Sequence, residues 1–365
     1  MSIDHVPLDS GWPGRLVIER HAESGSWIVL AVHAVVRGRF DGGTRMRHYA
    51  TLADAVADAK RLAEAMTDKW AVHRIPCGGA KAVLMVPPEP LPAGVRRSLL
   101  RAYGELIADW RGAFTTGGDI GVGPDDLDVV AGAAGGAWVY GGNRQVIGAG
   151  DSAVITAEGL ASAMRATAAR LTGRPDLAGL RVAVQGAGKV GGHLVGLLLN
   201  AGAHVTVADE RPEAAEALSG ANPVPAAEIL HAECDILAPC ATGGVLNAAT
   251  IERLRCRAVV GGANNQLATY DDARRLAGMG VLFAPDFLVN AGGAMADLGM
   301  TELGWSRQEA LRRVRAIGDT LDQVYRRAEA DGVTPWEAAR ERARLFLEEN
   351  RAAITGAGYG PRPDR

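Results

Sequence analysis

The stretch RVAVQGAGKVG, residues 181–191, decides the fold of this chain. Residues 180–185 form a short apolar run that predicts a strand, and a helix is predicted over 190–201. Between them stand Gly186, Gly188 and Gly191, which have the spacing GxGxxG. A strand, a glycine turn and a helix in this order are typical of a Rossmann unit.

The same unit predicts a dinucleotide site. The first glycine allows a tight turn, the second lets the backbone approach a pyrophosphate, and the third permits close packing of helix on strand. The helix N-terminus, at Lys189 and Val190, favours phosphate charge. Asp209 ends the next predicted strand, His204–Ala208, where it would bind ribose hydroxyls and repel a 2′-phosphate. We therefore expect NAD rather than NADP as the cofactor, although Arg211 weakens this preference. The structural alternative is a tight strand–helix turn that binds no ligand.

Outward from this unit, strand and helix patterns alternate toward the C-terminus. Further strands are predicted over 235–238, 258–261 and 281–284. Helices are predicted over 153–171, 250–254 and 271–279, and a helical tail over 306–353. This alternation favours an α/β fold with a parallel, doubly wound sheet. We place the Rossmann domain at about residues 141–329 and a first domain at about 1–140 plus 330–365.

The composition of the chain limits the kinds of function that it can have. The chain has 365 residues, enough for two domains, and 48% of them are hydrophobic and 22% charged, as in an ordinary globular enzyme. A net charge of -3 without a long basic run argues against nucleic acid and anionic membrane as partners. With no 20-residue apolar stretch and no signal peptide pattern, we expect a cytoplasmic protein. The cysteines form no CxxC pair, so we expect reduced thiols and no structural metal at Cys77, Cys234, Cys240 and Cys256.

The first half carries several further features. Strands are predicted over 26–36, and an amphipathic helix runs from Leu52 to about Lys69. The segment 42–46, GGTRM, is predicted to be a turn that exposes backbone. Lys81 follows a glycine pair, and Asp119 stands among small residues. Each has a structural alternative: Lys69 as a solvated helix end, Lys81 as a loop lysine, and Asp119 as a turn former or helix cap.

These segments resemble the glutamate/leucine/phenylalanine/valine dehydrogenase family, closest to its leucine and valine branch. The resemblance runs from about Gly42 to Gly293 and rests on motifs that occur in the family's order. They are GGTRM (42–46), AMTDK (65–69), GGAK (78–81), GDIG (118–121), GAGDS (148–152), the GxGxxG, APCATGG (238–244), GGANNQL (261–267) and APDFLVNAGG (284–293).

The resemblance implies roles for the motif residues. Lys69, helped by Met66 and the backbone of Gly42 and Gly43, would hold the substrate and its carboxylate. Lys81 would activate the water that attacks the imine, which suits a partly desolvated lysine beside a second cation. Asp119 would pass protons to and from the amino group. The reaction implied is oxidative deamination of an L-amino acid to a 2-oxo acid and ammonia, with hydride leaving Cα for NAD.

The resemblance also implies surroundings for the nicotinamide and an architecture. Asn264 and the segment Ala238–Cys240 would border the nicotinamide, and Asn290 would lie near the cleft between domains. Such enzymes close that cleft to exclude water during hydride transfer. An N-terminal substrate and dimerisation domain would precede the Rossmann domain, with a C-terminal helix returning to the first domain. The expected assembly is a homo-oligomer, from dimer to octamer.

Two departures fall where the family selects the substrate side chain. Asp41 stands where leucine-specific relatives have an aliphatic residue, and Asp297 where relatives have serine or valine. Gly117 and Ala294 replace larger residues and would widen the pocket. Two unpaired buried carboxylates would cost more than a leucine side chain gains by burial, about 2 kcal/mol, so we expect a basic, arginine-like or strongly polar substrate. The alternative is that Asp41 or Asp297 pairs with a local arginine such as Arg39, Arg45 or Arg47.

Three rival readings remain open from the sequence. One is a leucine or valine dehydrogenase with an ordinary aliphatic substrate. Another is a reductase acting on an imine or amino acid in a specialised pathway. The third is a cofactor-binding regulator that has lost catalysis, against which the joint presence of Lys69, Lys81 and Asp119 argues.

Overall fold

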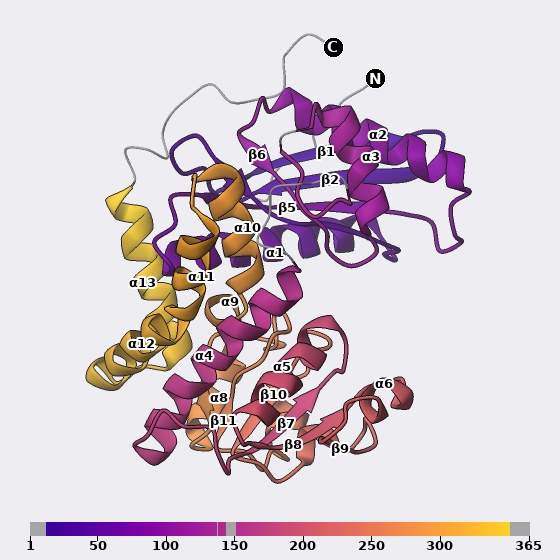
Figure 1. Cartoon of the computed structure of the whole chain (residues 1–365). Helices are drawn as coiled ribbons and strands as arrows, with labels where there is room; N and C mark the ends of the chain where they lie inside the picture. The colour runs from indigo at the N-terminus through magenta and orange to yellow at the C-terminus, as the bar shows by residue number, and fades with distance from the viewer. Residues whose placement is uncertain (1–11, 137, 144–150, 351–365) are drawn as a thin grey trace. The chain divides into compact units, whose positions relative to one another are not determined.

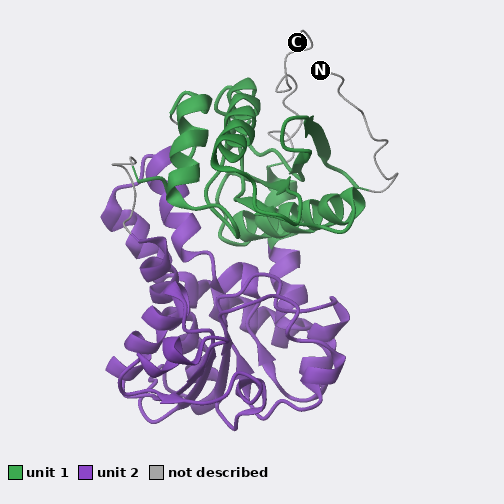
Figure 2. Cartoon of the chain, turned by 90° about the vertical axis from the view of Figure 1, so that its right-hand side faces the viewer, with its two compact units in different colours: residues 1–148, 343–365 green, residues 149–342 purple. Residues whose placement is uncertain are grey.

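The computed structural model describes residues 12–136, 138–143 and 151–350, and these form two compact units. The first unit is Met1–Gly148 with Ala343–Arg365, and the second is Ala149–Arg342 (Figure 2). Of the predicted segments, residues 148–150 of the GAGDS motif and the end of the helical tail, 351–353, lie outside the described residues.

The first unit is built on a mixed sheet with the order β1-β2-β5-β3-β6, in which β4 also pairs with β5. Antiparallel pairing joins β1 (Arg15–His21), β2 (Ser26–Val32) and β5 (Gly78–Met85). Parallel pairing joins the short strands β3 (Phe40–Asp41), β4 (Thr44–Arg47) and β6 (Phe114–Thr115) to this core.

Helices cover both faces of this sheet (Figure 1). On one face, α1 (Leu52–Val72) packs small residues such as Ala59 against Val83 of β5. On the other, α2 (Ala93–Asp109) and α3 (Pro124–Ala134) cover Ala82 and Leu84. Because strand side chains alternate, Lys81 shares the α1 face with Val83.

The second unit is a parallel sheet with the order β12-β11-β10-β7-β8-β9. Counted from β7, this is the Rossmann order, in which the chain starts centrally and reverses direction after three strands. The strands are β7 (Arg181–Gln185), β8 (His204–Ala208), β9 (Asn222–Pro223), β10 (Ile236–Pro239), β11 (Ala258–Val259) and β12 (Leu282–Phe283). The prediction of a doubly wound α/β fold is confirmed.

Helices pack on the second sheet from both sides. The long α5 (Lys189–Asn200) packs on β7 and β8, while an apolar cluster around Leu237 and Val259 is covered by Ile251 and Leu276. The other helices are α4 (Ser152–Thr172), α6 (Pro212–Glu216), α7 (Ala248–Ile251), α8 (Asp271–Gly278), α9 (Asp286–Val289), α10 (Gly292–Glu302), α11 (Arg307–Arg315), α12 (Ile317–Asp331), α13 (Pro335–Glu349) and the 3₁₀ turn η1 (Ile229–His231).

One expectation from the sequence needs correction. The GGTRM segment is not an exposed turn, because Thr44–Arg47 is strand β4, whose first three residues are buried against β5. The predicted helical tail is found as the three helices α11, α12 and α13, separated at Ala316 and at Gly332, whose φ of 66° ends α12. Strand β1 and helices α2 and α3 were not predicted at all. The expected C-terminal return is confirmed, since α13 ends within the first unit.

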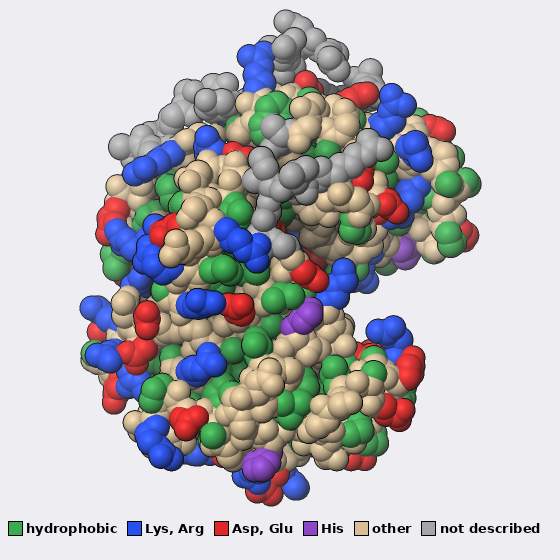
Figure 3. Space-filling view, viewed as in Figure 1, with side chains coloured by type: hydrophobic (Ala, Val, Ile, Leu, Met, Phe, Trp, Pro, Cys, Tyr) green, Lys and Arg blue, Asp and Glu red, His purple; other side chains and the backbone are tan. Residues whose placement is uncertain are grey.

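Charged side chains of both signs are interspersed over the face seen in Figure 3. This pattern agrees with the small net charge of -3. No helix within the described ranges is long and apolar enough to cross a membrane. The four cysteines are free thiols.

Candidate active site

Lys81 is the centre of the polar cluster in the first unit. It lies on β5 with only 5% of its surface exposed, so the loop-lysine alternative is wrong. Its Nζ lies 2.7 Å from Oδ2 of Asp119. A Cβ added to Gly43 would stand 3.3 Å from the same Nζ and 3.5 Å from the Asp119 Cβ. The sheet therefore brings together three residues that the sequence predicted, Gly43, Lys81 and Asp119.

Asp119 follows β6 and is shared by two cations. Arg45 Nε donates to Asp119 Oδ2 over 2.9 Å, so Lys81 and Arg45 bind the same carboxylate oxygen. Burial works to raise the Asp119 pKa, but the Lys81 and Arg45 charges outweigh it and hold that pKa well below its usual range. Burial, aided by the Arg45 charge, lowers the pKa of Lys81 against the opposing Asp119. A lysine with a lowered pKa beside a fixed carboxylate can exchange protons near neutral pH.

Arg45, Asp58 and Tyr49 extend this cluster and were not predicted as site residues. Arg45 lies on β4, and its Nη1 donates to Asp58 Oδ2 on α1 over 2.9 Å. The Tyr49 hydroxyl donates to the same Asp58 oxygen over 2.7 Å. The sequence carried a signal for Asp58, because it interrupts the buried stripe of α1 between Ala55 and Leu62 at helical spacing.

The Gly42–Gly43 segment is pressed against β5. A Cβ on Gly42 would stand 1.7 Å from the Ala80 carbonyl oxygen, so only glycine fits there. Behind it, the Thr116 hydroxyl donates to the Gly42 carbonyl over 2.7 Å and lies 2.8 Å from the Thr44 hydroxyl. This buried hydroxyl network fixes the backbone that the family resemblance assigns to the substrate carboxylate.

Lys69 and Met66 lie near the end of α1. Lys69 is in the last helical turn and 7% exposed, so the solvated-end alternative is wrong. Met66 is half-buried. Lys69 follows Asp58 by about three helical turns, so the two lie along one face of the helix. Helix α1 packs closely on β5, because a Cβ on Gly79 would stand 2.1 Å from the Thr67 backbone nitrogen.

Asp41 is fully buried at 0% exposure. It accepts hydrogen bonds from the Thr115 hydroxyl over 3.0 Å and from the Tyr140 hydroxyl over 3.2 Å. Gly117 does not open the pocket as expected, because a Cβ there would meet the Tyr140 ring at 2.2 Å. Tyr140 therefore fills the space beside Gly117 and also covers Asp41. Arg45, which the sequence suggested as a possible partner for Asp41, forms its ion pairs with Asp58 and Asp119.

In the second unit, the glycine turn has the geometry that a pyrophosphate requires. Gly186 has a φ of 99°, and a Cβ on Gly191 would stand 1.9 Å from the Gly186 carbonyl oxygen. By contrast, a Cβ on Gly188 would meet nothing within 4 Å. Gly188 is the exposed N-cap of α5, followed by exposed Lys189 and half-buried Val190. The turn is thus tight on its protein side and open at the helix N-terminus, which fits a dinucleotide phosphate.

Asp209 is anchored beside this turn. Its Oδ2 accepts from the Ala187 backbone N–H over 2.8 Å, and its Oδ1 from the Arg211 N–H over 3.0 Å. These two backbone donors lower the pKa of Asp209, so it is an anion at neutral pH. The Arg211 side chain is 70% exposed, with Nε 3.8 Å from Asp209. An anion at this place suits free ribose hydroxyls.

The residues expected to border the nicotinamide form a second set in this unit. Asn290 Nδ2 donates to Asn264 Oδ1 over 2.8 Å, which orients the exposed Asn264 amide. Ala238 is fully buried in β10, and burial raises the pKa of the Cys240 thiol to about 11. Cys240 is therefore a protonated thiol at neutral pH and not a nucleophile.

Ala294 and Asp297 lie three residues apart on α10, so they share one helix face. Both are half-exposed, in contrast to their buried neighbours Met295 and Ala296. This is the face that the sequence analysis assigned to the substrate side chain.

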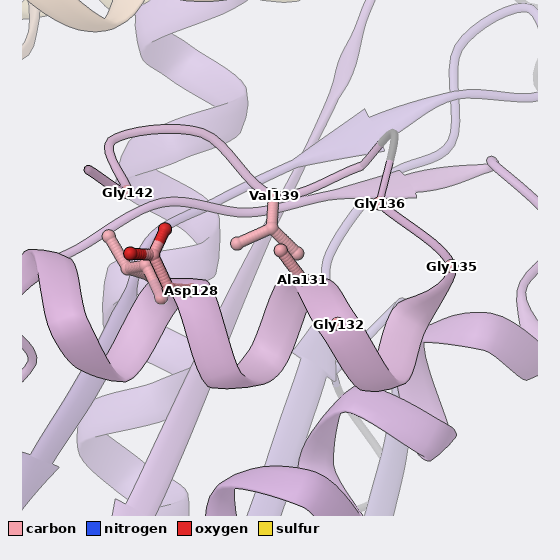
Figure 4. Close-up of a pocket in the computed structure, with 8 residues that line it drawn as sticks. Asp128, Ala131, Gly132, Gly135, Gly136, Val139 and Gly142 are labelled. Carbon is pink, nitrogen blue, oxygen red and sulfur yellow. The ribbon is translucent and has the colours of Figure 1, made fainter. Parts of the chain in front are cut away.

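A cavity of about 330 Å³ lies beside α3, between Asp128 and Ala131 on the helix and Val139 on the following segment (Figure 4). Its described lining includes none of the residues predicted to bind substrate or cofactor. Lys81 and its partners, not this cavity, therefore define the candidate active site.

Comparison with known proteins places the chain. The family model for "Glutamate/Leucine/Phenylalanine/Valine dehydrogenase" matches residues 212–345, and that for the "Glu/Leu/Phe/Val dehydrogenase, dimerisation domain" matches residues 25–134. The chain belongs to the glutamate/leucine/phenylalanine/valine dehydrogenase family. It is an oxidoreductase of the amino acid dehydrogenase class.

Members of this family resemble the chain over nearly its whole length. A valine dehydrogenase of Streptomyces albus is 39% identical, with 94% of each chain covered. A leucine dehydrogenase of Thermoactinomyces intermedius is 34% identical, covering 92% of this chain and 90% of the relative. The crystal structure of L-tryptophan dehydrogenase from Nostoc punctiforme superposes with a TM-score of 0.77 and 32% identity, covering 93% of this chain and 98% of that one. The resemblance to the family, near its leucine and valine branch, is confirmed.

Proposed function

We propose that this chain catalyses the NAD-dependent, reversible oxidative deamination of an L-amino acid to the 2-oxo acid and ammonia. The observation that carries the proposal is the buried Lys81–Asp119 pair, 2.7 Å apart, beside the Gly42–Gly43 backbone. A member of this family needs an acid–base group of that kind, because the reaction removes a proton from the amine and adds water to an imine.

The chain's own residues carry the proton steps. Lys69 and the Gly42–Gly43 backbone bind the substrate carboxylate. Asp119 takes a proton from the substrate ammonium, and the Cα–H bond then breaks with its electron pair to leave an imine. Lys81 takes a proton from the water that attacks the imine carbon, and Asp119 returns its proton to the nitrogen. The C–N bond then breaks as the remaining hydroxyl proton passes to the departing ammonia, which leaves the 2-oxo acid and ammonium. Burial of Lys81 at 5% exposure excludes bulk water from this exchange.

The glycine turn and Asp209 would hold the cofactor. Gly188 offers open backbone at the helix N-terminus, and Asp209 is an anion placed for ribose hydroxyls. Bound NAD supplies the hydride acceptor. Anionic Asp209 favours NAD over NADP, since a 2′-phosphate would meet the negative charge.

For the substrate side chain we propose a basic or strongly polar group. The support is the half-exposed Asp297, which shares a face of α10 with Ala294. Asp41 is covered by Tyr140, whose hydroxyl binds it. A substrate cation would contact Asp41 directly only after the Tyr140 ring moves, and would otherwise meet the Tyr140 hydroxyl. The relatives are named for valine, leucine and tryptophan, so the family leaves the side chain open.

The test is reduction of NAD or NADP, followed by absorbance, with arginine, lysine, ornithine, leucine, valine, tryptophan and glutamate. We expect turnover with NAD that Lys81→Ala lowers by a factor of 100 or more, on the order of a lost general base. We expect Asp297→Val to lower turnover of basic substrates and to raise that of leucine.

The outcomes separate the alternatives. Turnover of leucine or valine alone would keep the dehydrogenase and remove the basic side chain. Absence of turnover together with NADH binding would favour an imine reductase or a regulator that has lost catalysis. Activity unaffected by Lys81→Ala would contradict the assigned mechanism.

A further inference from the structure

Arg45 links the Lys81–Asp119 pair to a second carboxylate, Asp58 on α1. Its Nε binds Asp119 Oδ2 and its Nη1 binds Asp58 Oδ2, both over 2.9 Å. Arg45 is 7% exposed, and the side chains of Asp58 and Asp119 are 14% and 17% exposed. The chain of contacts therefore runs from Asp58 through Arg45 to Asp119 and Lys81 with little solvent around it.

The charges alternate in sign along this chain of contacts. Asp58 and Asp119 are negative, and Arg45 and Lys81 positive, so the four groups sum to zero when all are ionised. When Lys81 gives up its proton, Asp119 keeps one cation on the same oxygen, because Arg45 cannot be deprotonated in a protein. Without Arg45, loss of the Lys81 proton would leave a mostly buried carboxylate without its counter-charge, which is costly.

We propose that Arg45 is a positioning residue that keeps Asp119 compensated while Lys81 exchanges its proton, and that Asp58 and Tyr49 hold Arg45 in place. This inference rests on the proposed function, in which Lys81 is the acid–base group. Tyr49 adds its hydroxyl to Asp58 over 2.7 Å, and Arg61 binds the other Asp58 oxygen over 2.8 Å from the exposed side. Arg45 is thus fixed at both ends.

The charged groups around Lys81 come from four elements. Strand β4 brings Arg45, the segment after β6 brings Asp119, and α1 brings Asp58 together with Lys69 and Asp68 near its end. Strand β3 ends with Asp41, and β2 contributes no charged residue. Arg45 raises the local positive potential and Asp58 lowers it, so removing each must shift the proton affinity of Lys81 in opposite directions.

The test titrates Lys81 directly. The full-length protein, without substrate, is labelled with trace acetic anhydride from pH 7 to 11, and mass spectrometry follows acetylation of the peptide that contains Lys81. We expect Arg45→Met to move the Lys81 titration up by about one pH unit or more, and the isosteric Asp58→Asn to move it down; one unit is a tenfold change in free amine at fixed pH. The matched control is Arg47→Met, which removes an exposed cation from the same strand.

Further variants separate electrostatics from folding. Arg45→Lys keeps the cation but cannot bridge two carboxylates, so it should shift the titration less than Arg45→Met while still lowering kcat. Circular dichroism checks that each variant is folded, and the Asp58→Asn result decides the matter if Arg45→Met does not fold. Shifts in the same direction for Arg45→Met and Asp58→Asn, or shifts no larger than that of Arg47→Met, would overturn the inference. Failure to turn over any amino acid would instead refute the proposed function. The titration would still decide whether Arg45 and Asp58 set the proton affinity of Lys81.

Discussion

Asp119 holds its charge in the folded protein because Lys81 and Arg45 share one of its oxygens. Its pKa lies below the unfolded value of about 3.9, so the stability it contributes is present above that pH and is lost as the pH falls toward the folded pKa. In Asp119→Asn, buried Lys81 loses its counter-charge and Arg45 keeps only Asp58, which should cost about 3–5 kcal/mol at neutral pH. The variant should also lose less stability than the wild type between pH 5 and 3.

Urea unfolding followed by circular dichroism at pH 7, 5 and 3 measures both effects. Asp126→Asn is the control, because its ion pair with Arg96 is more exposed, with 35% of the Arg96 side chain accessible. Because part-exposed pairs contribute less than buried ones, we expect a smaller loss of stability in Asp126→Asn than in Asp119→Asn. Equal losses in the two variants, or an Asp119→Asn curve parallel to the wild type in acid, would contradict the assignment of Asp119 as the shared anion.

The sequence predicted the candidate residues Lys81 and Asp119 but not the residues that hold them in place. Lys81 and Asp119 stand in motifs that resemble a family, so their identity could be read from the chain. Arg45 stands in the same kind of motif, yet only its position on β4 shows that it bridges Asp58 and Asp119. Tyr140 was missed for a similar reason, because its contact with Gly117 joins residues whose proximity depends on the fold and not on spacing.

At the scale of elements, the closeness of α1 and β5 sets where Lys69 stands relative to Lys81. A Cβ on Gly79 would approach the Thr67 backbone nitrogen to 2.1 Å and the Ala63 carbonyl oxygen to 2.5 Å, and backbone atoms cannot rotate away. Gly79→Ala should therefore push α1 off β5, lower the free energy of unfolding by about 1–3 kcal/mol and raise KM for the amino acid.

Gly94→Ala is the matched control for that change. Gly94 lies in α2, and a Cβ there would meet nothing within 4 Å, so alanine should be neutral or stabilising by up to about 1 kcal/mol. Thermal unfolding and steady-state kinetics compare the two variants. If Gly79→Ala matched Gly94→Ala in both, the tight α1–β5 packing would not position Lys69.

The two sheets differ in how far the sequence could predict them. Strands β7 and β8 are regular runs of five residues, and a recognisable glycine turn follows β7, so the Rossmann unit could be predicted from the pattern. In the first unit, β3 and β6 have two residues each, too short for a period-two pattern. They form only because β5 offers β3 a parallel partner and β3 offers one to β6, which is a tertiary effect.

At the scale of the whole chain, the first unit contains segments from both ends of the sequence. The chain leaves this unit after Gly148 and returns to it at Ala343, within α13. The described returning segment brings Phe346, which is 5% exposed, and Glu349, which binds Arg74 over 2.6 Å. Arg74 also lies over the Phe346 ring, 5.3 Å from its centroid. The fold of the first unit therefore depends on contacts between segments that lie far apart in the sequence.

The expected contributions to the free energy of unfolding show which of these contacts stabilises the first unit. Phe346→Ala removes a buried aromatic side chain, which should lower the free energy of unfolding by about 3–5 kcal/mol. The Arg74–Glu349 pair is about half exposed on both sides and should contribute only about 0–1 kcal/mol. We therefore expect Phe346→Ala to lower the unfolding temperature clearly and Glu349→Ala to leave it nearly unchanged. Truncation after Arg342 should resemble or exceed Phe346→Ala. Differential scanning calorimetry distinguishes the variants, and an unchanged profile after truncation at Arg342 would show that the first unit does not need its C-terminal segment.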